Sequence, residues 1–208
     1  MGKNWVDWHY EYDITGSSLW RRLGLVQGRI RDALDAQPAG PIRVLSMCAG
    51  QGRDLLGVLP DHRRRADVTA TLVELDPHNV TVARAAAAGL DVTVIEGDAG
   101  VSTPYRDVVP VDIALVCGVF GNVSDGDIRR TVGWLPRLCR RGATVIWTRH
   151  RGEPDRTPAI RQWFVDTGFE EIGFDSAEDT TSIGVGTNVF TGEPRAFEPD
   201  VRLFAFSR

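Results

Sequence analysis

Two kinds of hydrophobic spacing divide the chain near residue 41. Before that point, apolar residues recur every three or four positions, which is the spacing of one buried helix face. The residues on that face are Leu19, Leu23, Val26, Ile30 and Leu34. Ser17 or Ser18 can cap the first turn of this helix, and Gly40–Pro41 ends the unit.

Beyond Gly40–Pro41 the chain alternates between short apolar runs and helical patterns. Strands are predicted for residues 43–50, 68–76, 91–98, 111–123, 143–150, 168–176 and 201–208. Helices are predicted for residues 52–60, 78–89, 125–142 and 157–168. Because the strands are apolar throughout and mostly separated by helices, we expect an α/β protein with a mostly parallel sheet and helices on both faces.

The last two predicted strands break this alternation. Residues 180–200 are rich in Gly, Thr and Pro and fit no helix. A long loop or hairpin there would make the final strand antiparallel. We therefore expect a single domain, made of an N-terminal lid and helix in residues 1–41 and a sheet-forming core in residues 42–208.

Composition and charge narrow the classes of function. The 208 residues are 42% hydrophobic and 25% charged with a net charge of −4, so no basic nucleic-acid-binding surface is expected. No apolar run reaches membrane-spanning length and no apolar signal segment is visible, so we expect a soluble cytoplasmic protein without a membrane partner. Cys48, Cys117 and Cys139 form no CxxC pair, and the histidines lack ligand spacing, so neither disulfides nor a metal site is expected.

The stretch Cys48-Ala49-Gly50-Gln51-Gly52-Arg53-Asp54 follows the first predicted strand of the core. Gly50 and Gly52 can adopt positive φ and leave no side chain between the backbone and a ligand. The helix that follows directs free N–H groups toward the same point. The same turn also suits tight packing of a strand against a helix, so both interpretations stay open for the loop alone.

Acidic residues end the next two predicted strands. Glu74 lies at a strand tip, where a carboxylate can accept two hydrogen bonds from a ribose diol. Asp76 precedes Pro77 and can instead cap the next helix. Asp98 can accept a hydrogen bond from an exocyclic amine such as that of adenine, or it can form a turn.

In this order, and at the spacing of one strand–helix unit, these stretches resemble the class I S-adenosylmethionine (SAM) dependent methyltransferase family. The resemblance covers residues 42–208. VLSMCAGQG matches the first motif through Gly50 and Gly52, with Cys48 at the first glycine and Ser46 at the acid. VELDP and VIEGDA are similar to the second motif and the adenine-contacting motif. VDIALVCGVFGNVSD, LPRLCRRGATVIW, GFEEIGF and VRLFAFSR resemble the fourth motif, the fifth-strand region and the last two strands.

The resemblance implies a Rossmann-like sheet of seven strands, the last antiparallel, that binds SAM and releases S-adenosylhomocysteine (SAH). The cofactor-binding residues it implies, together with neighbours chosen from the sequence, are Tyr12, Cys48, Ala49, Gly50, Gly52, Asp54, Glu74, Leu75, Asp98, Ala99, Cys117 and Gly118. Cys48 in place of glycine predicts a backbone without positive φ there. Ser46 cannot make the contact of the family's acid to the amino acid end of SAM. Asp54 either supplies that carboxylate or stabilises the helix N-terminus.

The candidate catalytic residues follow the fourth and fifth predicted strands. His150 can act as a general base and Asn122 can orient an acceptor, while Arg149 can hold an acceptor carboxylate or phosphate. The alternatives are an exposed loop with ordinary salt bridges and, for Asn122, a turn.

Aromatic residues of the N-terminal segment are candidates for a lid over the cofactor. They are Trp5, Trp8, Tyr10 and Tyr12, of which Tyr12 is preferred because it lies nearest the predicted helix. The alternative is that they bury the helix against the sheet. Arg21 and Arg22 are interpreted as solvated charges by default, although they can also reach an acidic acceptor.

The resulting expectation is a methyltransferase of the EC 2.1.1 type that acts on a small-molecule acceptor, with a homodimer as a further expected assembly. A non-catalytic SAM-fold binding or scaffold protein is the main alternative. An NAD-dependent oxidoreductase is a weaker one, since Leu55 stands where GxGxxG has its third glycine.

Overall fold

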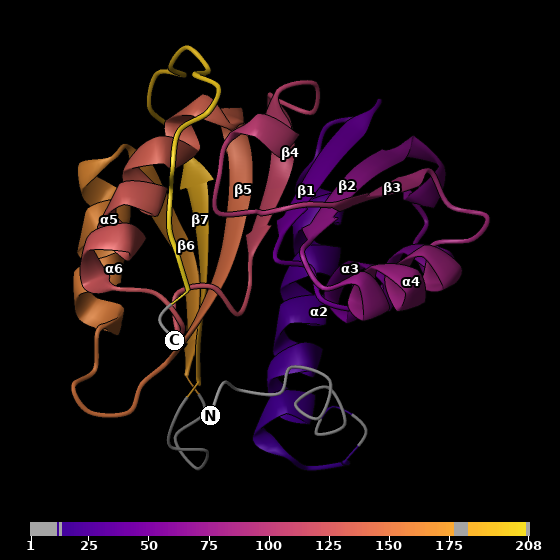
Figure 1. Ribbon diagram of the computed structural model, residues 1–208, viewed down its shortest axis with the longest axis horizontal. Helices are drawn as coiled ribbons and strands as arrows, with labels where there is room; N and C mark the ends of the chain where they lie inside the picture. Colours follow the sequence, from indigo (N-terminus) through magenta and orange to yellow (C-terminus); the bar gives the residue numbers. More distant parts are fainter. Residues whose placement is uncertain (1–11, 13, 177–182, 207–208) are drawn as a thin grey trace.

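A seven-stranded sheet runs through the protein in the computed structural model, which describes residues 12, 14–176 and 183–206. The strand order is β3-β2-β1-β4-β5-β7-β6, with β3 at one edge and β6 at the other (Figure 1). The strands are β1 (Ile42–Met47), β2 (Val68–Glu74), β3 (Val92–Glu96), β4 (Val111–Val116), β5 (Cys139–His150), β6 (Phe169–Ser176) and β7 (Ile183–Phe190).

Strand direction follows the prediction of a mostly parallel sheet. β1 to β5 are parallel, whereas β7 pairs antiparallel with both β5 and β6. The order reverses at β1, which has β2 on one side and β4 on the other. This reversal opens a crevice beyond the carboxyl ends of β1 and β4, the place where open α/β sheets bind ligands.

Helices cover both faces of the sheet, as predicted. They are α2 (Ser18–Ala36), α3 (Arg53–Leu56), α4 (Pro77–Ala86), α5 (Asp125–Trp134) and α6 (Thr157–Asp166). Short 3-10 turns lie at Leu59–Asp61, Arg65–Asp67, Thr103–Tyr105 and Leu135–Arg137. The Ser17 hydroxyl caps α2 by accepting a hydrogen bond of 3.0 Å from the backbone N–H of Trp20.

Two hydrophobic clusters lie on opposite faces of the sheet. Val44, Ile113 and Ile146 join the cluster under α2, α3 and α4. Their neighbours along the same strands, such as Leu45 and Val145, join the cluster under α5 and α6. Successive side chains of a strand point to opposite faces, so apolar runs such as Val44–Leu45 supply both clusters at once.

The seventh strand lies elsewhere than the sequence predicted. β7 is Ile183–Phe190, inside the stretch interpreted as a loop, and residues 201–206 form only an isolated bridge between Arg202 and Val101. Glycine misled the prediction because Gly184 and Gly186 weaken a strand pattern. In the fold they leave room for aromatic rings: a Cβ on Gly186 would lie 2.1 Å from Cε2 of Trp147.

Two predicted helices are also shorter than expected. The helix predicted over 125–142 ends at Trp134, and β5 already begins at Cys139, which pairs with Val111. Pro136 lies in the 3-10 turn between them and cannot continue an α-helix. Likewise, only Arg53–Leu56 of the predicted 52–60 is α-helical.

Candidate functional site

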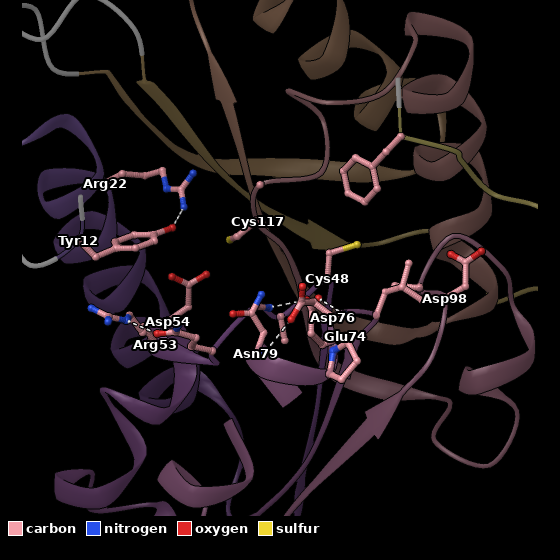
Figure 2. A pocket seen from close by; sticks show the side chains of 18 residues that line it. Tyr12, Arg22, Cys48, Arg53, Asp54, Glu74, Asp76, Asn79, Asp98 and Cys117 are labelled. Atoms are coloured by element: carbon pink, nitrogen blue, oxygen red, sulfur yellow. Dashed lines mark hydrogen bonds between the residues drawn. The ribbon is translucent and has the colours of Figure 1, made fainter. Parts of the chain in front are cut away.

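A cavity of about 410 Å³ lies beyond the carboxyl ends of the first four strands. The predicted cofactor residues that line it are Tyr12, Cys48, Ala49, Gly50, Asp54, Glu74, Leu75, Asp98, Ala99, Cys117 and Gly118. In Figure 2, Tyr12, Arg22, Arg53 and Asp54 lie on one side of the cavity and Asp98 on the other. Residues of separate βα units therefore line one cavity, as their positions after successive strands predicted.

The glycine loop after β1 corrects one prediction. Cys48 has a φ of 51°, so the backbone is left-handed there although the residue is not glycine. The next two residues are fixed to β2: the Ala49 N–H donates to the Val73 carbonyl at 3.0 Å, and the Gly50 N–H donates to Glu74 Oε2 at 2.7 Å. These contacts hold the loop in the conformation that the prediction had excluded.

The Cys48 thiol has a packing role. The side chain packs against the cluster under α5 and α6. Burial raises the pKa of the thiol well above its ordinary value, and the negative charges of Glu74 and Asp98 raise it further. A protonated thiol is a poor nucleophile, so no covalent chemistry is assigned to it.

Gly52 is the one predicted cofactor residue that does not line this cavity. Its φ is 73°, and an added Cβ would lie 2.6 Å from Cδ1 of Leu56 and 2.8 Å from Cδ2 of Leu72. The packing interpretation of the loop therefore holds for Gly52, while Gly50 faces the cavity.

Glu74 joins the glycine loop to the start of α4. Besides the bond from Gly50, its Oε1 accepts a hydrogen bond of 2.9 Å from the Asp76 N–H. A carboxylate has about four lone-pair sites, so each oxygen can accept one further bond from a ligand. Asp76 caps α4 as predicted, since its Oδ1 accepts from His78 N at 2.9 Å and from Asn79 N at 3.1 Å.

Asp98 stands at the opposite end of the cavity. Its Oδ1 accepts a turn-forming bond of 2.7 Å from Gly100 N, and its Oδ2 pairs with Arg202 Nη1 at 2.6 Å. Arg202 belongs to the C-terminal segment, which is also fixed by a 2.8 Å bond from Leu203 N to the Gly100 carbonyl. This segment places Phe206 at the same cavity.

Arg22 was interpreted as a solvated charge, and for this residue that interpretation is wrong. It is 8% exposed, lines the cavity and donates a hydrogen bond to the Tyr12 hydroxyl. Burial raises the pKa of Tyr12, which remains a neutral phenol. Arg22 lies three residues after Leu19 and four before Val26, so its place on the buried face of α2 was readable from the helical spacing.

Asp54 lies beside this arginine. Burial raises the pKa of its carboxyl, whereas the Arg22 charge and a hydrogen bond with Cys117 act in the opposite direction. Asp54 also stands in the first turn of α3, so both of its predicted roles are geometrically open.

Seven cavity residues were not among the predicted site residues. They are Arg22, Gln51, Arg53, Asp76, Pro77, Asn79 and Phe206. Asn79 is 2% exposed, and its Oδ1 has no hydrogen-bond partner in the part of the chain that the structure describes. No sequence signal identified Phe206, because its segment was assigned to a strand. The lid candidates Trp5, Trp8 and Tyr10 lie outside the described residues.

A second cavity of about 180 Å³ adjoins the first and shares Arg22 and Gly118 with it. It contains both candidate catalytic residues, His150 and Asn122, together with Arg149. Asn122 Nδ2 donates to the Gly118 carbonyl at 2.7 Å and so shapes the loop after β4. His150 Nε2 lies 2.6 Å from Arg149 Nη1. Because a guanidinium only donates, Nε2 accepts in this contact, and a neutral imidazole then carries its proton on Nδ1.

The described residues contain neither a metal-ligand cluster nor a membrane-spanning helix. Among residues 12, 14–176 and 183–206, no group of three His, Cys, Asp or Glu side chains can hold a metal ion. The same part of the chain contains no helix long and apolar enough to cross a bilayer.

The fold is that of the class I SAM-dependent methyltransferases. The magnesium protoporphyrin IX methyltransferase of Synechocystis PCC 6803, solved with bound SAM, superimposes with a TM-score of 0.62 over 92% of this chain and 99% of its own, at 15% identity. An O-methyltransferase family protein of Burkholderia thailandensis gives 0.59 at 18% identity, covering 81% of this chain and 57% of its own. The [4+2]-cyclase SpnF gives 0.60 at 17% identity, covering 78% and 80%.

Neither protein-family models nor curated proteins match the sequence. The resemblance inferred from the motifs is thus confirmed at the level of the fold, which these solved structures share with the chain.

Proposed function

We propose that this protein is a SAM-dependent methyltransferase that acts on a small-molecule acceptor. The observation that carries the proposal is the pairing of two adjoining cavities, one bordered by the glycine loop and by Glu74 and Asp98, the other by polar side chains after β4 and β5. The first suits a nucleoside cofactor and the second an acceptor. Arg22 and Gly118 line both, so the two ligands would meet there.

The first cavity offers a suitable group for each part of SAM. Glu74 can accept from the ribose hydroxyls, and Asp98 from the adenine amine, with Leu75, Ala99 and Phe206 as apolar walls. At the other end, Arg22 can bind the carboxylate and Asp54 the ammonium of the amino acid part. The buried Asn79 Oδ1, which lacks a partner among described residues, supplies a further acceptor for that ammonium.

When bound, SAM supplies an electrophilic methyl group on a sulfonium. The residues of this chain then have to position the acceptor and exclude water, because an in-line approach supplies most of the rate. Asn122 and Thr148 fix the Gly118 loop between the cavities, with Gly118 N donating to Thr148 Oγ1 at 2.9 Å. His150 Nε2 can take a proton from an acceptor OH or NH once Arg149 has moved from it to the acceptor, because Nδ1 carries the proton while Nε2 accepts from Arg149.

The structural similarity to SpnF favours one alternative function. That protein is described as a [4+2]-cyclase, so its fold is not confined to proteins described as methyltransferases. A non-catalytic or differently catalytic SAM-fold protein would bind SAM without transferring its methyl group. Turnover of SAM to SAH over a panel of phenol, amine, thiol and carboxylate acceptors separates the two.

Calorimetric titration with SAM, SAH and NAD tests the cofactor. We expect SAM and SAH to bind and NAD not to bind. Glu74→Ala removes the ribose acceptor and should weaken SAM binding by about tenfold or more, since hydrogen bonds to charged groups contribute ~1.5–3 kcal/mol. NAD binding without SAM binding would contradict the proposal.

Glu96→Ala is the matched control for Glu74→Ala. Glu96 ends the neighbouring strand and pairs in register with Glu74, but it is exposed and does not line the cavity. We expect its SAM affinity to stay within about twofold of the wild type. Equal losses in the two variants, or none in Glu74→Ala, would contradict the ribose assignment.

A further inference from the structure

The ionisable residues that line the second cavity are all basic. Its ten lining residues include Arg22, Arg149 and His150 but no aspartate or glutamate. The remaining polar groups come from Ser18, Asn122 and Thr148. A small hollow lined by guanidinium groups and neutral polar groups is complementary to an anion.

Arg149 is the residue that distinguishes this cavity from an ordinary polar hollow. It is half-buried at the carboxyl end of β5, and its Nε is buried without a hydrogen-bond partner among the described residues. Its Nη1 faces His150 Nε2, a neutral acceptor when that nitrogen carries no proton. No carboxylate in the described part of the chain forms a salt bridge with it.

Two acidic residues lie near Arg149, but each forms a salt bridge with another arginine. Arg151 pairs with Asp155 at 3.0 Å, and Arg156 pairs with Asp125 at 3.1 Å. Burial lowers the pKa of Arg149, and the Arg156 charge acts in the same direction, while Asp125 and Asp155 oppose them from a distance. The Arg149 guanidinium is thus held in a partly desolvated place without its own counter-ion.

The backbone beneath Arg149 keeps the side chain close to the cavity. A Cβ on Gly121 would lie 3.6 Å from Arg149 Nη1 and 3.6 Å from His150 Cδ2, so both side chains pack over that glycine. A partly buried cation without a counter-ion in the protein is unfavourable unless a ligand supplies the negative charge. The guanidinium fork fits carboxylate and phosphate oxygens with two parallel hydrogen bonds.

We propose that the acceptor carries an oxyanion, either a carboxylate or a phosphate, and that Arg149 binds it in the second cavity. The inference rests on the proposed function, because it assigns the ligand of the cavity that adjoins the cofactor cavity. Arg149 would act as a specificity-determining residue and not as a base. It would hold the acceptor with its reactive atom directed toward Gly118 and the cofactor.

The test measures anion binding to the SAH-loaded protein by calorimetry and ligand-observed NMR. Acetate, benzoate, inorganic phosphate and phenyl phosphate are the probes, with acetamide, benzamide and phenol as neutral counterparts. We expect at least one anion to bind about tenfold or more tightly than its neutral counterpart. The carboxylate and phosphate series show which oxyanion the site prefers.

Arg149→Gln should abolish this preference and leave SAH affinity within about twofold, because Arg149 does not line the first cavity. Arg156→Gln is the matched control, since Arg156 lies nearby but lines neither cavity, and it should keep the preference. Arg149→Lys keeps the charge without the fork and should give intermediate binding. It also serves if Arg149→Gln does not fold.

Equal binding of anions and neutral counterparts to the wild type would overturn the inference, as would a preference that survives in Arg149→Gln. Failure of the proposed function has a different signature: the wild type would turn over SAM with no acceptor of the panel, or would not bind SAH at all. In that case the same titrations without SAH still decide whether Arg149 binds an oxyanion.

Discussion

At the scale of single residues, Cys48 shows how strongly neighbouring contacts can determine the backbone. A left-handed conformation costs a non-glycine residue about 1–2 kcal/mol. Hydrogen bonds offset this cost here, because the backbone N–H groups of Ala49 and Gly50 both donate to the end of β2. The identity of one residue was therefore a poor guide to its φ, and the contacts that fix it were invisible in the sequence.

Substitution of Cys48 tests this strain. Cys48→Gly removes the left-handed cost but also removes a packed thiol, so we expect a free energy of unfolding within about 1 kcal/mol of the wild type. Cys48→Val adds a β-branched side chain at positive φ and should lose about 2 kcal/mol or more. Urea denaturation measures both; equal stability of the two variants would contradict the assignment of strain.

Asp54 yields a prediction about pH. Because folding raises the pKa of this carboxyl, the folded state holds the proton more tightly than the unfolded state. Stability is thus lost as pH rises from the ordinary value of 3.8 through the raised pKa, and Asp54→Asn escapes that loss. The variant should gain melting temperature relative to the wild type on going from pH 3.5 to 7, since about 3.5 lies below the ordinary carboxyl pKa.

The same variant should bind SAM more weakly, because an amide cannot pair with an ammonium group as a carboxylate does. Thermal melts at both pH values, with and without SAM, measure the two effects. A difference in melting temperature that stays constant with pH would show that Asp54 titrates normally.

At the scale of elements, β7 marks the limit of prediction from pattern. Periodic helices and apolar strands before residue 176 were found because each carries its own repeat. β7 depends instead on a distant partner, since its glycines fit against Trp147 of β5 and Phe174 of β6. Only the fold shows which ring lies over which glycine, so the sequence read this strand as a loop.

Gly186→Ala tests that close approach. The added methyl group would lie 2.1 Å from the Trp147 ring, which is fully buried and stacked on Phe164 at 5.6 Å. Overpacking of this kind costs about 1–3 kcal/mol. Gly28→Ala is the control, because a Cβ there meets nothing within 4 Å; in helix α2 it should stabilise by about 0.5–1 kcal/mol. Guanidinium denaturation measures both, and a neutral Gly186→Ala would refute the packing argument.

At the scale of the whole molecule, the order of motifs was a better guide than any one motif. The glycine loop alone fitted either a cofactor site or simple packing. In the structure Gly50 lines the first cavity, whereas Gly52 packs against Leu56 and Leu72. Strand order brings residues far apart in the sequence together, so most of the predicted cofactor-binding residues line the first cavity. The prediction missed Phe206, whose place depends on how the C-terminal segment packs. It also missed Arg22, because the helical spacing puts this residue on the buried face of α2 without showing that this face borders the cavity.

Binding of a cofactor across these elements should stabilise the whole fold. At a SAM concentration of about 100 times Kd, linkage adds ~2.7 kcal/mol, which for a protein of this size raises the melting temperature by roughly 5–10 °C. NAD at the same concentration should leave it unchanged. A scanning-calorimetry experiment that shows a shift with NAD and none with SAM would favour the oxidoreductase alternative.

The cavity walls formed by Tyr12 and Phe206 have a consequence for biosynthesis. These two residues come from opposite ends of the described chain, and both line the same cavity. A ribosome would release Phe206 long after the glycine loop and Glu74 have left the exit tunnel. Closing so long a loop carries an entropy cost that must be met before the contact forms. The nascent chain would therefore complete the walls of the first cavity only after Phe206 has emerged from the ribosome.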